Sequence, residues 1–305
     1  MPEDVIICDD TSKFETEAQV AKLKQLLKDA GEIGCEAALR KHDHNVAYLM
    51  DEKRARYLEI VDIQQQEDVL EVGSSMGQHS RLIAKQCRKL DGLEVVEDQA
   101  RFASLWCRQC GADNVKMTAG GASGALPYSD ASFDVVIMNY VLEWCAGREI
   151  DNPDEFHLRL LKEVRRVLKP SGRFFLSTKN RYGLRLLLGS VDEHLGVRFG
   201  NALPRWIGRA LSRGVARDIP RGHLHSRRAL ERLLREAGFA RIDAYLSFPD
   251  ARRPDIITLF DKGGAEMLRE LDHSKYSKKD RLYLALPRSV QEQTATSHTF
   301  IARAV

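Results

Sequence analysis

The chain has 305 residues, 43% of them hydrophobic and 30% charged, and its formal net charge at pH 7 is only +3. This is the composition of a globular protein, and no apolar run reaches the roughly 18 residues that a membrane span needs. The N-terminal sequence MPEDVIICDD is acidic and lacks the basic and apolar segments of a signal peptide. The six cysteines are scattered, which argues against a disulfide framework and predicts a cytoplasmic protein.

The first 63 residues are expected to be helical. In AQVAKLKQLLKDAG, Val20, Leu23 and Leu27 recur at helical spacing, and Gly31 is a signal for the end of the helix. The run EKRARYLEIVDI has a second helical pattern that leads into the first strand. We therefore assign residues 1–63 to an N-terminal helical cap.

From residue 64 onward, predicted strands and helices alternate. The strands are DVLEV, KLDGLEVV, NVKMTA, FDVVIMNY and RFFLST, and the helices between them include HSRLIAKQC, RFASLWCRQCG and DEFHLRLLKEVRRVL. The last of these helices is expected to stop at KPSG. Such alternation predicts a parallel sheet with helices on both faces.

The alternation breaks after residue 180. We assign 64–180 and 226–248 to the core, 181–225 to a basic lid insertion, 249–296 to a second, irregular insertion, and 297–305 to a last core strand. The predicted fold is therefore α/β and Rossmann-like: a seven-stranded, mostly parallel sheet with helices on both faces, an N-terminal helical cap and two lid insertions.

The segment DVLEVGSSMGQHSRLIAKQ reads as strand, tight turn and helix, which is the usual arrangement for holding a nucleotide. A dinucleotide turn has the pattern GxGxxG, and here its three positions hold Gly73, Ser75 and Gln78. That pattern fails at two positions. The alternative pattern of acid, Gly, small residue and Gly at every second position is met by Glu71, Gly73, Ser75 and Gly77.

An acid at the end of the first strand favours a ligand that carries positive charge and disfavours a pyrophosphate. Glu94 follows Glu71 by 23 residues, about the spacing at which a carboxylate accepts the two ribose hydroxyls. S-adenosylmethionine has both a ribose and a cationic ammonium and sulfonium, so it is the expected cofactor in preference to NAD.

The motifs EVGSSMG, GLEVV, LPYSDASFDVVIMNYVLEW and RRVLKPSGR together resemble class I S-adenosylmethionine-dependent methyltransferases of the type-11 kind, over residues 66–180. The resemblance implies that Glu71, Gly73, Ser75 and Gly77 hold the methionine part, Glu94 the ribose, and that Asn139 and Tyr140 line the methyl donor. In this family an acid usually lies near the adenine amine. Here that position is Ala122, so the backbone near Gly121 to Ser123 is expected to hold the adenine.

The segments KNRYGLRLLLGSVDEHLGVRF and FPDARRP resemble, more distantly, methyltransferases that accompany bacterial cell-surface polysaccharide assembly. This resemblance implies a sugar or glycan acceptor. A hydroxyl acceptor needs a base, and His194, beside Asp192 and Glu193 in the insertion, is the first candidate. The alternative for His194 is a surface histidine on a polar loop.

Glu143 is a second catalytic candidate because it follows the fourth strand, with Trp144 as a platform for the acceptor. The alternative there is a core-facing Trp with a solvated Glu. His223 and His225 are weaker candidates for the base. Cys107 and Cys110 have CxxC spacing but no second ligand pair, so we interpret them as ordinary thiols of a helix and expect no metal site.

The insertion is rich in arginine, with ten arginines and three acids from Arg181 to Arg228. Four of these arginines recur at every fourth residue, and apolar residues form a stripe on the opposite side of the same predicted helix. The arginines are Arg205, Arg209, Arg213 and Arg217, and the apolar residues are Leu203, Trp206, Ile207, Ala210 and Leu211. This pattern indicates an amphipathic lid helix with a solvated basic face. A surface for anionic lipid or for a phosphorylated acceptor is the alternative.

Nucleic acid is a disfavoured partner because the net charge is small and NYVLEW lacks the proline-rich run of base methyltransferases. We therefore predict O-methylation of a sugar or glycan hydroxyl. One form of this hypothesis has an acceptor that also carries a phosphate or a lipid. Two alternatives remain: methylation of a small metabolite or natural product, and a catalytically silent S-adenosylmethionine-binding scaffold. The expected location is the cytoplasm, with contact to the inner membrane face as an alternative.

Overall fold

The structure is a computed structural model that describes residues 5–9, 17–146, 152–215 and 222–304. The chain divides into two compact units. The first comprises Met1–Met138 with Glu163–Phe174, and the second comprises Asn139–Lys162 with Phe175–Val305. The division passes through α8 (Pro153–Val167) and β6 (Leu168–Lys179), so each of these elements contributes to both units.

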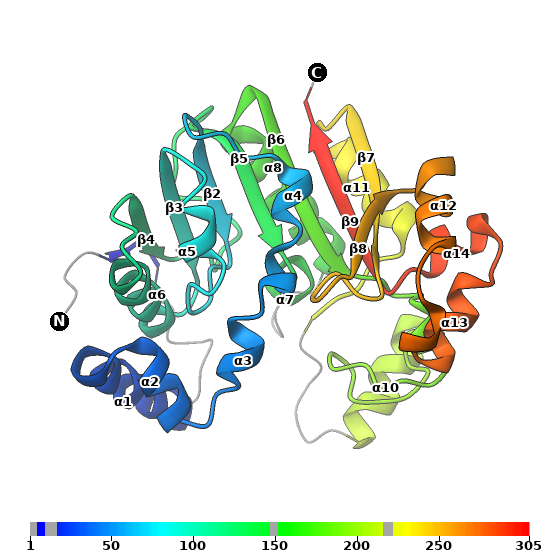
Figure 1. Ribbon diagram of the computed structural model, residues 1–305, viewed down its shortest axis with the longest axis horizontal. Coiled ribbons are helices and arrows are strands. Elements are labelled where there is room, and N and C mark those ends of the chain that lie inside the picture. The colour runs from blue at the N-terminus through cyan, green and yellow to red at the C-terminus, as the bar shows by residue number, and fades with distance from the viewer. Residues whose placement is uncertain (1–4, 10–16, 147–151, 216–221, 305) are drawn as a thin grey trace. The chain divides into compact units, whose positions relative to one another are not determined.

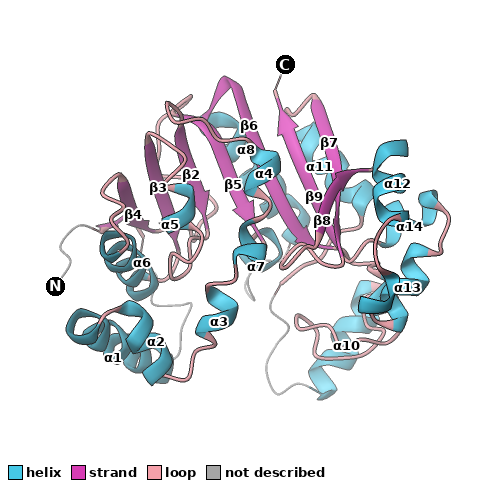
Figure 2. Cartoon of the chain, in the orientation of Figure 1, coloured by secondary structure: helices cyan, strands magenta, loops and turns pink. Residues whose placement is uncertain are grey.

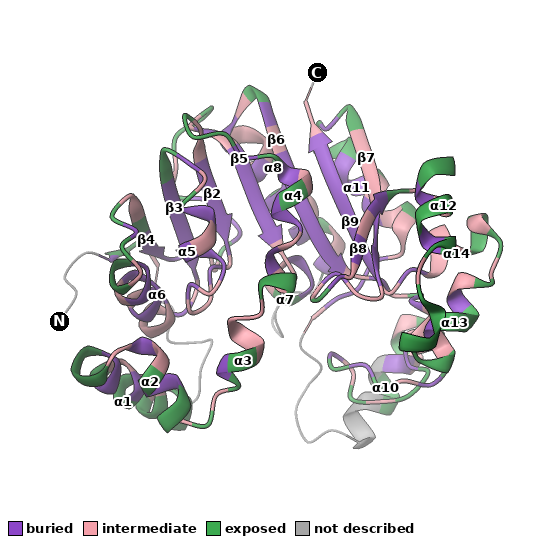
Figure 3. Ribbon diagram, viewed as in Figure 1, coloured by how far each residue is buried: buried purple, intermediate pink, exposed green. Residues whose placement is uncertain are grey.

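The first unit is built on parallel strands. They are β1 (Ile6–Ile7), β2 (Asp68–Val72), β3 (Lys89–Glu94), β4 (Val115–Ala119) and β5 (Phe133–Asn139), whose last residue belongs to the second unit. Their order is β1-β4-β3-β2-β5, and each neighbouring pair is parallel. Strands β2 and β5 are rich in Val, Leu and Ile and are buried along most of their length (Figure 3), as strands covered on both faces are.

Helices cover this sheet and form the N-terminal part of the chain. They are α1 (Glu17–Ile33), α2 (Cys35–Lys41), α3 (Val46–Leu49), the 3₁₀ turn η2 (Glu52–Ala55), α4 (Leu58–Val61), α5 (Ser80–Ile83) and α6 (Glu97–Gln109). Helix α6 packs on β3 and β4, and α1 and α2 pack on α6 (Figure 1). Leu26 and Leu39 from the cap join Phe102 and Trp106 of α6 in one buried cluster, so the cap shares a core with this helix.

Three local expectations for this unit are wrong. Gly31 does not end its helix, because α1 continues to Ile33 and the chain turns at Gly34, whose φ of 90° lies in the left-handed region that favours glycine. The run EKRARYLEIVDI forms η2 and α4 instead of one helix, and α4 ends at Asp62, whose φ is 56°. The helix expected over HSRLIAKQC is the single turn α5.

The second unit adds an antiparallel group of strands. Strand β7 (Arg241–Phe248) pairs antiparallel with both β8 (Ile256–Leu259) and β9 (Ser297–Arg303), which flank it (Figure 2). Its helices are α7 (Leu142–Cys145), the first part of α8, α9 (Leu184–Leu187), α10 (Arg205–Val215), α11 (Arg227–Glu236), α12 (Lys262–Arg269), η3 (His273–Lys275), α13 (Lys278–Leu284) and α14 (Arg288–Thr294).

The segment 249–296 is regular, contrary to the sequence-based expectation of an irregular insertion. It contains β8 and the helices α12, η3, α13 and α14. Polar side chains cap three of these helices, since Asp261, Asp272 and Ser277 each accept a backbone N–H of the first turn. Leu268 and Tyr283 from these helices pack in one buried cluster with β7 and β8 side chains.

The predicted fold class is confirmed: an α/β fold with a mostly parallel sheet flanked by helices. The described residues form nine strands, whereas the sequence predicts seven. The two that were missed are β1, which has only two residues, and β8, which lies inside a presumed insertion. The division into cap, core and insertions remains a prediction. No helix among the described residues is both long and apolar enough to cross a bilayer.

Candidate functional site

The turn after β2 is bonded to β3, because the backbone N–H groups of Gly73 and Ser74 both donate to the Leu93 carbonyl, at 2.7 and 3.2 Å. Gly73 and Gly77 have φ of 78° and 83°, and Ser75 has a φ of 50°. A side chain at Gly77 would place its Cβ 2.9 Å from the Cα of Ala103 in α6. Gly77 is therefore required for the approach of the turn to α6, whereas Gly73 lies where the chain leaves the strand.

Glu94, at the end of β3, is tied to this turn. Its carboxylate accepts the Ser75 N–H at 2.7 Å through Oε2 and the Val96 N–H at 3.1 Å through Oε1. The orientation of this carboxylate by two backbone groups fits the predicted role of holding the two ribose hydroxyls of S-adenosylmethionine.

Glu71 lies at the same edge, one residue before the end of β2, and is almost completely buried. Its Oε2 accepts the Ser80 hydroxyl. Burial raises the pKa of the Glu71 carboxyl to about 8. A cation placed beside Glu71 would stabilise the ionised carboxylate, so the ammonium of S-adenosylmethionine fits this position when it brings its charge into the buried site.

We expect donor binding at this site to depend on pH because Glu71 must ionise. Below pH 8 ionisation costs about 1.4 kcal/mol per pH unit, and this cost disappears as the pH approaches 8. The affinity for S-adenosylhomocysteine should therefore rise between pH 5.5 and 7.5, by up to about tenfold per pH unit, with release of a proton. Calorimetry in two buffers with different ionisation heats measures both quantities. Glu71→Gln should remove the pH dependence, and a proton count of zero in the parent would contradict the role of Glu71.

The position that lacks an acid in the sequence, Ala122, is half-buried in the turn after β4. The neighbouring Gly121 N–H donates to Oδ2 of Asp9 at 2.8 Å. Asp9 follows β1, which pairs with β4. The sequence analysis missed Asp9, since nothing in the pattern of a two-residue strand indicates that it pairs beside Ala122. A carboxylate is thus present near the predicted adenine position, although it comes from another part of the chain.

The residues after β5 belong to the second unit. Asn139 ends the strand, and Tyr140 follows with a φ of 60°. The Tyr140 N–H donates to the Ser177 carbonyl at 2.7 Å, and its hydroxyl donates to Oδ1 of Asp250 at 2.8 Å. Tyr140 is therefore held at both ends, by β6 and by the FPDARRP segment.

His194 is buried, so the interpretation of a surface histidine is wrong. Its Nδ1 lies 2.9 Å from Oδ1 of Asp192, which is also buried. A carboxylate at Nδ1 holds the hydrogen there and leaves a lone pair on Nε2. Nε2 is buried and has no hydrogen-bond partner among the described residues. The ring of Trp144 lies against the imidazole, with centroids 4.2 Å apart.

Glu143 and Trp144 have the opposite exposure from the alternative that the sequence left open. Glu143 is 1% exposed and Trp144 42% exposed. Oε2 of Glu143 accepts the Thr178 hydroxyl at 2.6 Å, and Oε1 has no hydrogen-bond partner within the described parts of the chain. Burial, as the largest cause, raises the pKa of the Glu143 carboxyl above its ordinary value.

Of the four arginines in the predicted basic stripe, only Arg205 has a described side chain, and it is not simply solvated. Arg205 contacts the ring of His223 and lies 3.9 Å from Oδ1 of Asp154. On the opposite side, Trp206 is 74% exposed and Leu211 is 46% exposed, so the apolar stripe is not buried as the lid-helix interpretation requires. The side chains of Arg209 and Arg213, and the whole of Arg217, lie outside the described residues.

Comparison with known proteins identifies the domain. Residues 70–176 match the model of the methyltransferase domain family. The chain is 30% identical to a demethylmenaquinone methyltransferase of Lactococcus lactis over 51% of this chain and 57% of that protein. It is 31% identical to a malonyl-[acyl-carrier protein] O-methyltransferase of Methylococcus capsulatus over 36% of each chain. The chain thus spans about half or less of the length of these curated relatives.

A solved structure supports the fold. The PH0226 protein from Pyrococcus horikoshii OT3 superposes with a TM-score of 0.52 at 16% identity, covering 83% of this chain and 89% of that one. The family match runs from β2 to β6, and this range contains Glu71, the glycine turn and Glu94. The match confirms the class predicted from the motifs and, with it, the predicted cofactor S-adenosylmethionine. The individual site residues remain predictions.

Proposed function

Because residues 70–176 are a class I S-adenosylmethionine-dependent methyltransferase domain, we propose that the chain transfers a methyl group from S-adenosylmethionine to a hydroxyl oxygen. The observation that supports a hydroxyl acceptor is the buried pair of Asp192 and His194, in which the carboxylate bonds to Nδ1 and Nε2 has no hydrogen-bond partner among the described residues. An alcohol must lose its proton during transfer, and a neutral imidazole is the side chain suited to take it.

In this proposal three residues of the second unit, His194, Asp192 and Glu143, have separate roles. Bound S-adenosylmethionine supplies a methyl group activated by the positive sulfur, and alignment of the acceptor provides most of the acceleration. His194 takes the hydroxyl proton at Nε2. Asp192 orients the imidazole and stabilises the imidazolium that forms. Glu143, whose Oε1 has no hydrogen-bond partner within the described residues, bonds to a polar group of the acceptor.

The acceptor that we favour is a sugar or a sugar-derived glycan. The exposed Trp144 ring beside His194 offers a flat apolar surface for one face of a ring-shaped molecule. Exposed apolar side chains of the insertion, which would suit a lipid-linked form of this acceptor, are Leu188, Val191, Phe199 and Trp206. A quinol or another small aromatic acceptor is the second candidate, and it is favoured by relatives named as demethylmenaquinone methyltransferases.

The decisive experiment is transfer of label from methyl-labelled donor to fractionated acceptors. Saccharides, lipid-linked saccharides, quinols and RNA are incubated with the protein separately. We expect the label in a saccharide fraction, and we expect it to resist mild alkali, as a methyl ether does and a methyl ester does not. Alkali-labile label would move the acceptor to a carboxylate. Label in the quinol fraction would support the second candidate, and label in none would favour a silent binding protein.

Donor binding can be tested without an acceptor. S-adenosylhomocysteine should raise the melting temperature, because a ligand that binds only the native state stabilises it by mass action. At 100 times the dissociation constant the stabilisation is about 2.7 kcal/mol. NAD at the same concentration should give no shift. A shift with NAD alone would contradict the cofactor assignment.

A further inference from the structure

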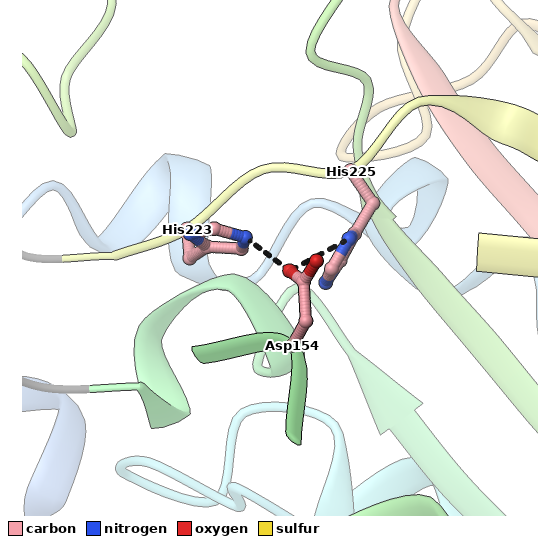
Figure 4. Close-up of side chains that lie close together, drawn as sticks. All are labelled: Asp154, His223 and His225. Carbon is pink, nitrogen blue, oxygen red and sulfur yellow. Dashed lines mark hydrogen bonds and ion pairs between the residues drawn. The ribbon is translucent and has the colours of Figure 1, made fainter. Parts of the chain in front are cut away.

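A separate cluster of ionisable side chains lies within the second unit. Asp154 is in the first turn of α8, and His223 and His225 precede Ser226, the N-cap of α11. One ligand atom from each of the three lies within 4.8 Å of the other two, and Figure 4 shows the Asp154 carboxylate directed between the two imidazole rings. In the part of the chain that the structure describes, no other group of His, Cys, Asp and Glu has this metal-binding arrangement.

The distances in this cluster are close to those of a coordinated ion. Oδ1 of Asp154 lies 2.7 Å from Nε2 of His223 and 3.9 Å from Nδ1 of His225. Tetrahedral Zn²⁺ with bonds of about 2.0–2.1 Å holds neighbouring ligand atoms about 3.3 Å apart. These two distances fall on either side of this value, and all three ligand atoms lie within 4.8 Å of one another, so a bound ion would draw the three side chains together.

The hydrogen bonding of His225 also favours a metal. Its Nε2 lies 2.7 Å from Nδ1 of His157, one turn along α8 from Asp154, whereas its Nδ1 is buried and has no hydrogen-bond partner among the described residues. An imidazole that ligates a metal normally has its other nitrogen held by a hydrogen bond. If Nε2 of His225 donates to His157, then Nδ1 carries a lone pair directed toward Asp154.

Arg205 supplies the positive charge in the structure as it stands. Its guanidinium contacts the His223 ring and lies near the Asp154 carboxylate. The Arg205 side chain is 36% exposed, so its head group can leave the cluster for solvent. A metal ion would bind the same Asp154 carboxylate, so it would compete with the Arg205 guanidinium for this group.

We propose that Asp154, His223 and His225 bind a divalent first-row transition-metal ion such as Zn²⁺ in place of the Arg205 guanidinium. Two imidazoles and a carboxylate suit these ions, and three protein ligands leave a position for water or another oxygen. Asp154 is 46% exposed, which provides the open side. The site differs from the sequence-based expectation of no metal, because Asp154 lies 69 residues before His223 and no local spacing connects them.

The site adjoins the residues assigned to the acceptor. The backbone N–H of His223 donates to the backbone carbonyl of Glu143 at 2.7 Å. The segment that carries two of the ligands is therefore bonded to the residue before Trp144. The proposal nevertheless does not rest on the methyltransferase activity. Metal binding can be measured on the protein without donor or acceptor.

The test starts from full-length protein stripped with a chelator and then freed of it. Zn²⁺ is titrated with a competing indicator, and bound metal is counted after gel filtration. We expect about one ion per chain, and substitution of Co²⁺ should give the visible absorption of a low-coordinate N/O site. His225→Ala and Asp154→Asn should each weaken Zn²⁺ binding by more than about 100-fold, and His157→Ala, which removes the supporting hydrogen bond together with a buried ring, by about 10- to 100-fold.

Two control variants separate binding from misfolding. His273→Ala removes a histidine of the second unit that bonds only to the Leu268 carbonyl within the described residues, and it should leave Zn²⁺ binding unchanged. Arg205→Gln removes the competing cation, so it should bind Zn²⁺ several-fold more tightly than the parent. The proposal is overturned if the stripped parent binds no stoichiometric Zn²⁺, or if His225→Ala binds it as the parent does. Weaker binding by Arg205→Gln would also contradict the proposed competition.

Discussion

Gly73→Val is expected to lower the affinity for S-adenosylhomocysteine by about 100-fold or more. Gly73 has a φ of 78°, and a β-branched side chain is strongly disfavoured there. The change also places a branched side chain on the turn whose next residues are tied to Glu94. Strain of about 1–3 kcal/mol would displace this turn. Calorimetric titration of the ligand measures the effect.

Gly111→Val is a matched control for this loss. Gly111 follows α6 with a φ of 74°, and a Cβ there would meet no heavy atom within 4 Å. The backbone strain is therefore similar, but the glycine turn and Glu94 are untouched. Both variants should lose similar stability to urea, while only Gly73→Val should lose donor affinity. An unchanged dissociation constant for Gly73→Val would show that this turn does not hold the donor.

The parallel core could be predicted because its signals are local. Each strand of β2 to β5 is a short apolar run bounded by turn residues, and each expected helix follows in sequence. The errors occur where long-range contacts decide the structure. Strand β8 exists because it pairs with β7, and the helices of 249–296 are stable because Leu268 and Tyr283 pack against those strands.

The same distinction applies to the site. Fixed spacings along the chain connect Glu71, the glycine turn and Glu94. Their positions at the carboxyl ends of neighbouring parallel strands therefore follow from the order of the chain. Asp9 comes from a remote strand whose pairing the sequence does not encode locally. His194 was found as a candidate, but its burial against Trp144 and its bond to Asp192 depend on the folding of the whole insertion.

His194→Ala is expected to lower turnover by about 10²- to 10⁴-fold, the usual contribution of a positioned general base. Donor affinity should stay the same, because His194 has no assigned contact with S-adenosylmethionine. His194→Gln should be equally slow, since an amide keeps much of the shape but cannot take the proton. Turnover and donor binding are measured separately, on the acceptor that takes the label. His273→Ala, which changes an exposed histidine, is the control.

Asp192→Asn distinguishes a positioned base from a histidine that only packs. The amide keeps the size of the side chain that bonds to Nδ1 of His194, but it no longer requires the hydrogen to be on Nδ1. Turnover should therefore fall although the His194 ring remains, and most of the loss should appear in kcat and little in KM. If His194→Ala stays within a few-fold of the parent, alignment alone accounts for transfer. If it loses donor affinity in proportion to turnover, His194 is a structural part of the insertion, and the hydroxyl proton must leave by another route.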